Sequence, residues 1–74
     1  MEIKTKFTIG EEVFFIANYL ICSDKIKSIY TQHSAKNRKF ICYVFEGYVT
    51  DRKEYELFET EEGAEAFLNR YNNE

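Results

Sequence analysis

The chain has 74 residues, of which 45% are apolar and 18% aromatic, and its formal net charge is -3. A chain of this length buries only about 60% of its unfolded surface, so it forms one small core rather than the separate cofactor and substrate domains of a multi-step enzyme. The aromatic content excludes an intrinsically disordered protein. We therefore expect a single aromatic-rich domain over residues 1–74.

The charge is segregated along the chain. Residues 24–40 carry five cations against one carboxylate, whereas residues 41–74 carry three cations against nine carboxylates. The net acidity argues against a protein that packages nucleic acid or coats anionic membranes. No window approaches the ~18 apolar residues of a membrane span, and the first residues lack the apolar run of a signal peptide. We expect a cytoplasmic protein with no membrane partner.

The two cysteines, Cys22 and Cys42, are expected to be buried thiols, because the cytoplasm keeps such pairs reduced. A metal site is not expected, since the chain has no Cys-x-x-Cys and only His33 could join the two thiols. The glycines are isolated and form no phosphate-binding loop, so we expect no cofactor.

Aromatic and β-branched residues crowd the N-terminal part of the chain. Residues 11–22 are expected to form a hairpin with its turn at Ala17–Asn18, because these residue types prefer a pleated surface. Thr8 and Glu11 have the spacing of a capping box, however, and would then open a helix through the same segment. The hairpin is favoured, and the helix is the alternative.

Residues 20–31 alternate imperfectly between apolar and polar. Ile26 and Tyr30 share one parity, but Ile29 falls on the other. A strand that bulges or bends between two parts of a sheet explains this shift.

The strongest strand signal is the run of six β-formers at residues 40–45, which is too short for a helix and bulky on both faces. Residues 48–49 and 54–58 then predict two shorter strands, with a turn at residues 50–53 between them.

The end of the chain carries the clearest helix signals. Thr60 is a good N-cap, and two glutamates follow it in the first turn. Apolar residues then recur with helical spacing at Ala64, Phe67, Leu68 and Tyr71. We expect a helix over about 61–71 whose stripe packs on the core, held by Phe67 and Leu68.

Three stretches of sequence resemble known small barrels. Residues 7–15 resemble the opening of SH3-like barrels, and residues 21–26 resemble their second strand, with Asp24 in place of the usual glycine. Residues 56–64 resemble the ending of short uncharacterised bacterial and phage proteins that append a helix to such a barrel, with Gly63 in place of a helix former. The resemblance implies no catalytic residues.

Elements and resemblance together predict a mainly β (β+α) fold. We expect a small SH3-like barrel or a bent antiparallel meander of four to five strands over about 6–58, followed by one C-terminal helix.

Little in the sequence supports an enzyme. His33 and Ser34 lie in a polar stretch that joins two strands, without the surroundings of a nucleophile or a general base. So short a chain also offers no sugar cleft between paired carboxylates. We expect a non-enzymatic protein.

Cations interleaved with aromatic residues give one candidate surface, because single-stranded nucleic acids bind where phosphates meet charge and bases meet rings. Tyr30, Phe40 and Tyr43 lie near these cations in the sequence. This candidate nucleic-acid surface consists of Lys25, Lys27, Lys36, Arg38 and Lys39.

Carboxylates give a second candidate surface, which could engage a basic partner or imitate the phosphates of nucleic acid as small phage inhibitors do. This acidic face consists of Glu54, Glu56, Glu59, Glu61, Glu62 and Glu65. The function that we favour is a protein-binding module, an accessory or host-interaction protein of a bacterium or phage that acts as a monomer or homodimer. A nucleic-acid-binding SH3-like domain is the alternative, and an acidic phage inhibitor is a further one.

Overall fold

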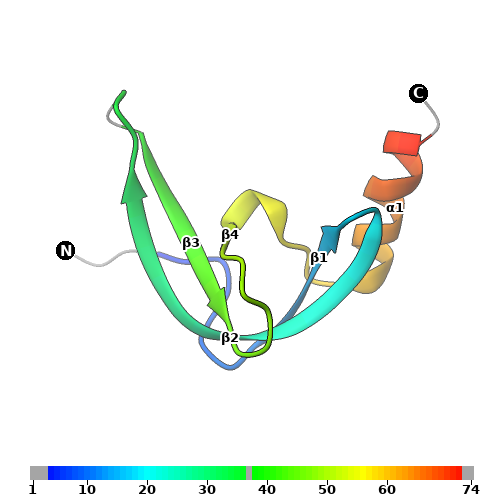
Figure 1. Cartoon of the computed structure of the whole chain (residues 1–74), viewed down its shortest axis with the longest axis horizontal. Coiled ribbons are helices and arrows are strands. Elements are labelled where there is room, and N and C mark those ends of the chain that lie inside the picture. The colour runs from blue at the N-terminus through cyan, green and yellow to red at the C-terminus, as the bar shows by residue number, and fades with distance from the viewer. Residues whose placement is uncertain (1–3, 37, 73–74) are drawn as a thin grey trace.

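A computed structural model describes residues 4–36 and 38–72 of the chain (Figure 1). Four antiparallel strands in the order β1-β2-β3-β4 curl into a half-barrel, and one helix follows at the C-terminus. The predicted mainly β fold is therefore confirmed. The elements are β1 (Glu12–Ala17), β2 (Leu20–His33), β3 (Lys39–Phe45), β4 (Arg52–Lys53), the 3₁₀ helix η1 (Glu54–Glu56) and α1 (Glu61–Asn72).

The predicted N-terminal hairpin is confirmed, and the helix alternative for this segment is wrong. Strands β1 and β2 pair antiparallel as far as Ala17 opposite Leu20, so the turn residues are Asn18 and Tyr19. Both have positive φ, 54° and 64°, as a two-residue hairpin turn requires. The turn thus lies one residue later than predicted.

The predicted bend in β2 is also confirmed. Its first part pairs with β1 and its second part with β3, and the register shifts between Ile26 and Ser28. Figure 1 shows β2 curving along the whole base of the molecule. Asp24 stabilises the bend, because its carboxylate accepts the backbone N–H of Gly47 at 2.9 Å, just beyond the end of β3.

The strand predicted at residues 40–45 is confirmed as β3, but the prediction for the next segment is wrong. Residues 48–49 form no strand, and the predicted turn contains β4, at Arg52–Lys53. The predicted strand at residues 54–58 is replaced by η1, and only Phe58 pairs with another strand.

Side-chain hydrogen bonds explain this correction. Glu56 accepts the backbone N–H of Lys53 at 2.7 Å, which closes the turn of η1. Glu54 accepts the hydroxyl of Tyr43 at 2.6 Å and the backbone N–H of Lys6 at 2.9 Å. Carboxylates that bond locally or to another segment compete with a strand ladder, and no alternation of apolar residues reveals them.

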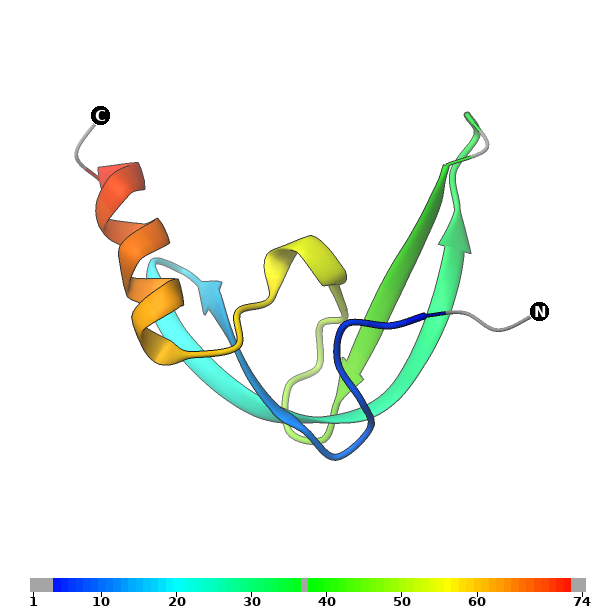
Figure 2. The same cartoon turned by 180° about the vertical axis from the view of Figure 1, so that it is seen from behind.

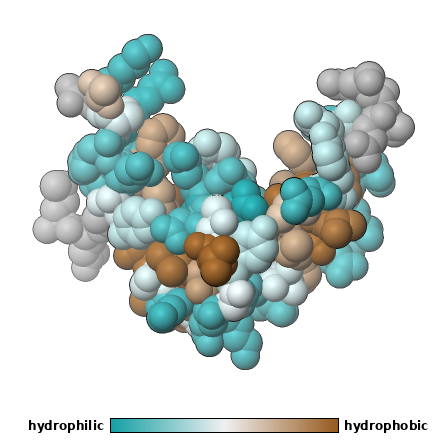
Figure 3. Space-filling model, in the orientation of Figure 1, coloured by the Kyte–Doolittle hydropathy of each residue, from teal (hydrophilic) through white to brown (hydrophobic). Residues whose placement is uncertain are grey.

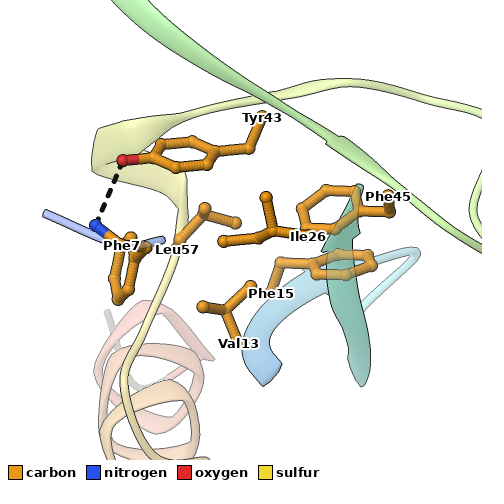
Figure 4. Packing of buried hydrophobic residues seen from close by; sticks show 7 residues of the cluster. All are labelled: Phe7, Val13, Phe15, Ile26, Tyr43, Phe45 and Leu57. Carbon is orange, nitrogen blue, oxygen red and sulfur yellow. Dashed lines mark hydrogen bonds between the residues drawn. The ribbon is translucent and has the colours of Figure 1, made fainter. Parts of the chain in front are cut away.

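The core lies inside the curve of the half-barrel (Figure 4). Phe15 stacks on Phe45 at 4.9 Å between ring centroids and meets Tyr48 edge-on at 5.0 Å. Both cysteines are free thiols as predicted, but only Cys42 is buried, since Cys22 is half-buried. The main cluster consists of Phe7, Val13, Phe15, Ile26, Tyr43, Phe45 and Leu57.

The predicted C-terminal helix is confirmed as α1, which lies beside the β1–β2 hairpin (Figure 2). Its N-cap is Thr60, whose hydroxyl accepts the N–H of Gly63 at 3.1 Å. The expected packing of its apolar stripe is only partly correct, because Ala64 is buried but Phe67 is 52% exposed. In the described part of the chain, neither α1 nor η1 has the length and apolar character that a membrane-crossing helix needs.

Candidate functional site

The five cations of the predicted nucleic-acid surface are all exposed, but they fall into two groups. Lys25 and Lys27 lie at the bend of β2, whereas the other three lie at the far tip of the β2–β3 hairpin, where His33 pairs with Lys39. His33 lies six residues after Lys27, which separates the groups by about 20 Å along the strand, at ~3.3 Å per strand residue. The cations therefore do not form one continuous patch.

The aromatic residues near these cations are mostly buried or already in contact with other side chains of the chain. Tyr43 is buried in the core, and Phe40 is half-buried beneath the ammonium of Lys53, at 5.6 Å from its ring. Tyr30 is exposed, and its hydroxyl donates to Asp51 at 2.8 Å. This hydrogen bond raises the pKa of Tyr30 to about 12. A row of free rings for stacking bases is not assembled here.

The predicted acidic face also divides. Glu54 and Glu56 are half-buried, and both accept hydrogen bonds from the chain itself. The remaining four carboxylates are exposed, at the start of α1 and just before it. These four are Glu59, Glu61, Glu62 and Glu65.

A groove that the sequence did not reveal runs beside α1 and consists of two adjoining hollows. Ile16 and Phe67 line both, and Figure 3 shows hydrophobic residues gathered at this end of the molecule. The first hollow, of about 370 Å³, is lined by Ile16, Asn18, Tyr19, Phe67, Leu68 and Tyr71. The second, of about 340 Å³, is lined by Ile16, Arg52, Tyr55, Glu56, Phe58 and Phe67.

The groove is rich in exposed aromatic rings. Tyr19 is 69% exposed, Tyr55 71% and Tyr71 61%, and Phe67 stands between them. The rings of Tyr19 and Tyr71 lie 6.4 Å apart, so the hairpin turn and the end of α1 form one wall. Helical periodicity had placed Phe67 and Tyr71 in the core, because a periodic stripe does not tell how much of it the sheet can cover.

Tyr19 has an unusual backbone conformation for so large a residue. Its φ of 64° is in the left-handed region, which favours glycine and in which bulky side chains are uncommon. Two-residue hairpins prefer Asn-Gly, and this chain has Asn18 followed by Tyr19. The ring therefore occupies the groove wall at a cost in local backbone energy.

Arg52 lines the second hollow, and one hydrogen-bond donor of its guanidinium is unpaired within the described residues. Its guanidinium lies 5.3 Å from the ring centre of Phe15 and 5.6 Å from that of Tyr48. Its Nε is buried and has no hydrogen-bond partner among the residues that the structure describes. Buried polar groups in proteins are nearly always paired, so this N–H is an unsatisfied donor on a side chain that lines the groove.

On the edge of β1 that faces away from β2, backbone hydrogen bonds form over only part of the strand. Phe14 donates its N–H to the carbonyl of Phe58 at 3.0 Å and accepts the N–H of Phe58 at 2.8 Å. Backbone groups alternate along a strand, so those of Ile16 point to the same outer side. Within residues 4–36 and 38–72 they meet no strand, because the chain turns away into η1.

Comparisons with known proteins identify no relative of this chain, so a proposal for its function depends on the fold and the groove. The chain matched no family model, and no curated protein or solved structure matched it significantly. Among the described residues, no three His, Cys, Asp or Glu side chains lie together as a metal site requires.

Proposed function

We propose that the chain is a non-enzymatic protein-binding module whose partner docks in the groove between the β1–β2 hairpin, η1 and α1. The observation that carries this proposal is the set of large exposed side chains around two adjoining hollows, at Tyr19, Tyr55, Phe67 and Tyr71. Exposed apolar patches of this kind mark interaction sites, and tyrosines are enriched among the residues that dominate binding energy.

The exposed carboxylates near the start of α1 favour a partner with a basic surface. A second copy of this chain would bring the same carboxylates, so a different protein fits this face better. The resemblance to bacterial and phage proteins with an SH3-like barrel supports an accessory or host-interaction role. The nucleic-acid alternative has less support, because its cations are divided between the bend of β2 and the β2–β3 tip.

Replacing Tyr19 with glycine is expected to raise stability and lower binding together. Glycine adopts a φ of 64° without the cost of about 1–2 kcal/mol that a side chain incurs there, so the free energy of unfolding should rise by up to about 1 kcal/mol. The groove would meanwhile lose one wall. Urea unfolding followed by circular dichroism measures the first effect. Lower stability would contradict the assignment of strain to this turn.

Replacing Phe67 with serine is expected to leave the chain folded, because half of this side chain is already exposed. The free energy of unfolding should fall by about 1 kcal/mol, below the cost of a fully buried phenylalanine. Partner binding should be lost, since Phe67 lies between both hollows.

Affinity capture from a lysate of the source organism tests the function itself. The wild-type chain, Tyr19→Gly and Phe67→Ser are compared with Val49→Ser, a control at a 97% exposed apolar residue that lines neither hollow. We expect the wild type and Val49→Ser to retain the same protein after nuclease treatment and at high salt, and the groove variants to lose it. Retention of nucleic acid that disappears at high salt would contradict the proposal.

A further inference from the structure

We infer that the groove takes an extended segment of the partner, which adds a strand to the free edge of β1 at Ile16 and presents a carboxylate to Arg52. This inference rests on the proposed function and specifies the form in which the partner binds. Three features of the described residues support it: the free backbone edge of β1 at Ile16, the unpaired guanidinium nitrogen of Arg52 and the different side chains on the two faces of β1.

The backbone edge favours a strand. Phe58 already pairs with Phe14 on the outer side of β1, and continuing that antiparallel pairing would place Glu56 opposite Ile16. Glu56 belongs to η1 and bonds to the N–H of Lys53, so the chain leaves this position open. An added strand supplies one donor and one acceptor to Ile16, as in other proteins that bind peptides at a sheet edge.

The guanidinium favours a carboxylate on that strand. Arg52 lines the same hollow as Ile16, and its buried Nε has no hydrogen-bond partner in the described part of the chain. A hydrogen bond between ionised groups is about twice as strong as a neutral one, and arginine binds carboxylates in a fork geometry. The exposed carboxylates near α1 act over longer distances, so they select the charge of the partner's surrounding surface and not this contact.

The two faces of β1 predict the pattern of the bound segment. Successive residues of a strand point to opposite faces, so Ile16 and Phe15 lie on opposite faces of β1. Ile16 shares the hollow with Phe58 and Phe67, whereas Phe15 carries the guanidinium of Arg52 over its ring. The bound segment should therefore alternate, with apolar residues on the Phe67 side and an acidic residue on the Arg52 side.

A bound helix fits these features less well. A helix uses its own backbone groups internally, so it would leave those of Ile16 without partners beneath it. The distinction is measurable, because only a strand protects the Ile16 N–H directly.

The test uses a phage-displayed library of random peptides selected on the wild-type chain of 74 residues. The tightest-binding peptide is synthesised, and amide hydrogen exchange of the protein is followed by NMR with and without it. We expect selected sequences to alternate apolar residues with an aspartate or glutamate, and exchange at the Ile16 amide to slow by at least about tenfold at saturation.

Variants then isolate each contact. Ile16→Pro removes the outward N–H while keeping the bonds to β2, and Ile16→Val, its matched control, keeps the N–H. Arg52→Gln should weaken binding by about tenfold or more, whereas Arg70→Gln, at an exposed arginine in the last turn of α1, should not. Exchanging the peptide's acidic residue for its amide should have no further effect in Arg52→Gln. Together, Arg52→Gln and the altered peptide form a double-mutant cycle, which tests the carboxylate contact even if Ile16→Pro does not fold.

Two results would overturn the inference. The first is selection of helical peptides that require Phe67 but leave the Ile16 amide unprotected, which would retain the proposed function and exclude strand addition. The second is failure to select any peptide while a whole protein is still captured from lysate through the groove. If neither the wild-type chain nor Val49→Ser captures a protein from the lysate, the result would instead contradict the proposed function.

Discussion

Replacing Phe15 with alanine is expected to lower the free energy of unfolding by about 3–5 kcal/mol. Phe15 is buried, stacks on Phe45 at 4.9 Å and meets Tyr48 edge-on at 5.0 Å, so its removal leaves a cavity bordered by rings that cannot easily close it. At about 0.05–0.15 kcal/mol per residue, a chain this short has a total stability of the same order. Thermal unfolding followed by circular dichroism should therefore show a largely unfolded variant.

The matched control is Val49→Ala, because Val49 is 97% exposed and its truncation opens no cavity. We expect this change to alter the unfolding free energy by no more than about 0.5 kcal/mol. A Phe15→Ala variant as stable as this control would show that the cluster inside the half-barrel is not the stabilising core.

Replacing Tyr43 with phenylalanine is expected to lower stability by about 1–3 kcal/mol at neutral pH, because it leaves the buried backbone N–H of Phe7 without its partner and removes a hydrogen bond to Glu54. The hydroxyl of Tyr43 donates to Glu54 at 2.6 Å. It also accepts the backbone N–H of Phe7 at 3.3 Å, as Figure 4 shows. It thereby joins β3 to η1 and to the segment before β1. Urea unfolding of both proteins measures this difference.

The same pair should show a characteristic pH dependence. Burial and the hydrogen bond to Glu54 raise the pKa of Tyr43 from its ordinary 10 to about 12, so the fold stabilises the protonated hydroxyl. That contribution is fully present below pH 10 and is lost as the pH rises through 12. The stability difference between wild type and Tyr43→Phe should therefore shrink over this interval. Tyr30 also titrates there, but it is present in both proteins. A constant difference would contradict the assignment.

Local sequence signals predicted several elements because their causes are local. The run at residues 40–45 is β-forming whatever surrounds it, and it makes up all of β3 except the first residue, Lys39. Thr60 caps α1 through a bond to a residue three positions on, so the start of the helix could be located without the fold. The broken alternation around Ile26 indicated the bend of β2 because a register shift changes side-chain parity.

The segment after β3 was mispredicted because its structure depends on distant partners. Residues 54–58 have the composition of a strand, but Glu54 bonds to Tyr43 and to Lys6, which is 48 residues away in the sequence. Such a contact outweighs the modest preference of the segment for a pleated conformation. Because residues 54–56 form η1 and not a strand, the backbone groups of Ile16 have no neighbouring strand on that side within the described residues.

By itself, the sequence determined that this chain forms a small, bent, mainly β domain with a terminal helix, since residue types, parity and caps act over a few neighbouring positions. Only the tertiary structure decided which apolar residues stay exposed. The curved sheet covers Ala64 but not Phe67 or Tyr71, because its area limits how much of the helical stripe it can bury. The same curvature separates the predicted cations and brings Ile16, Arg52 and Phe67 to one hollow.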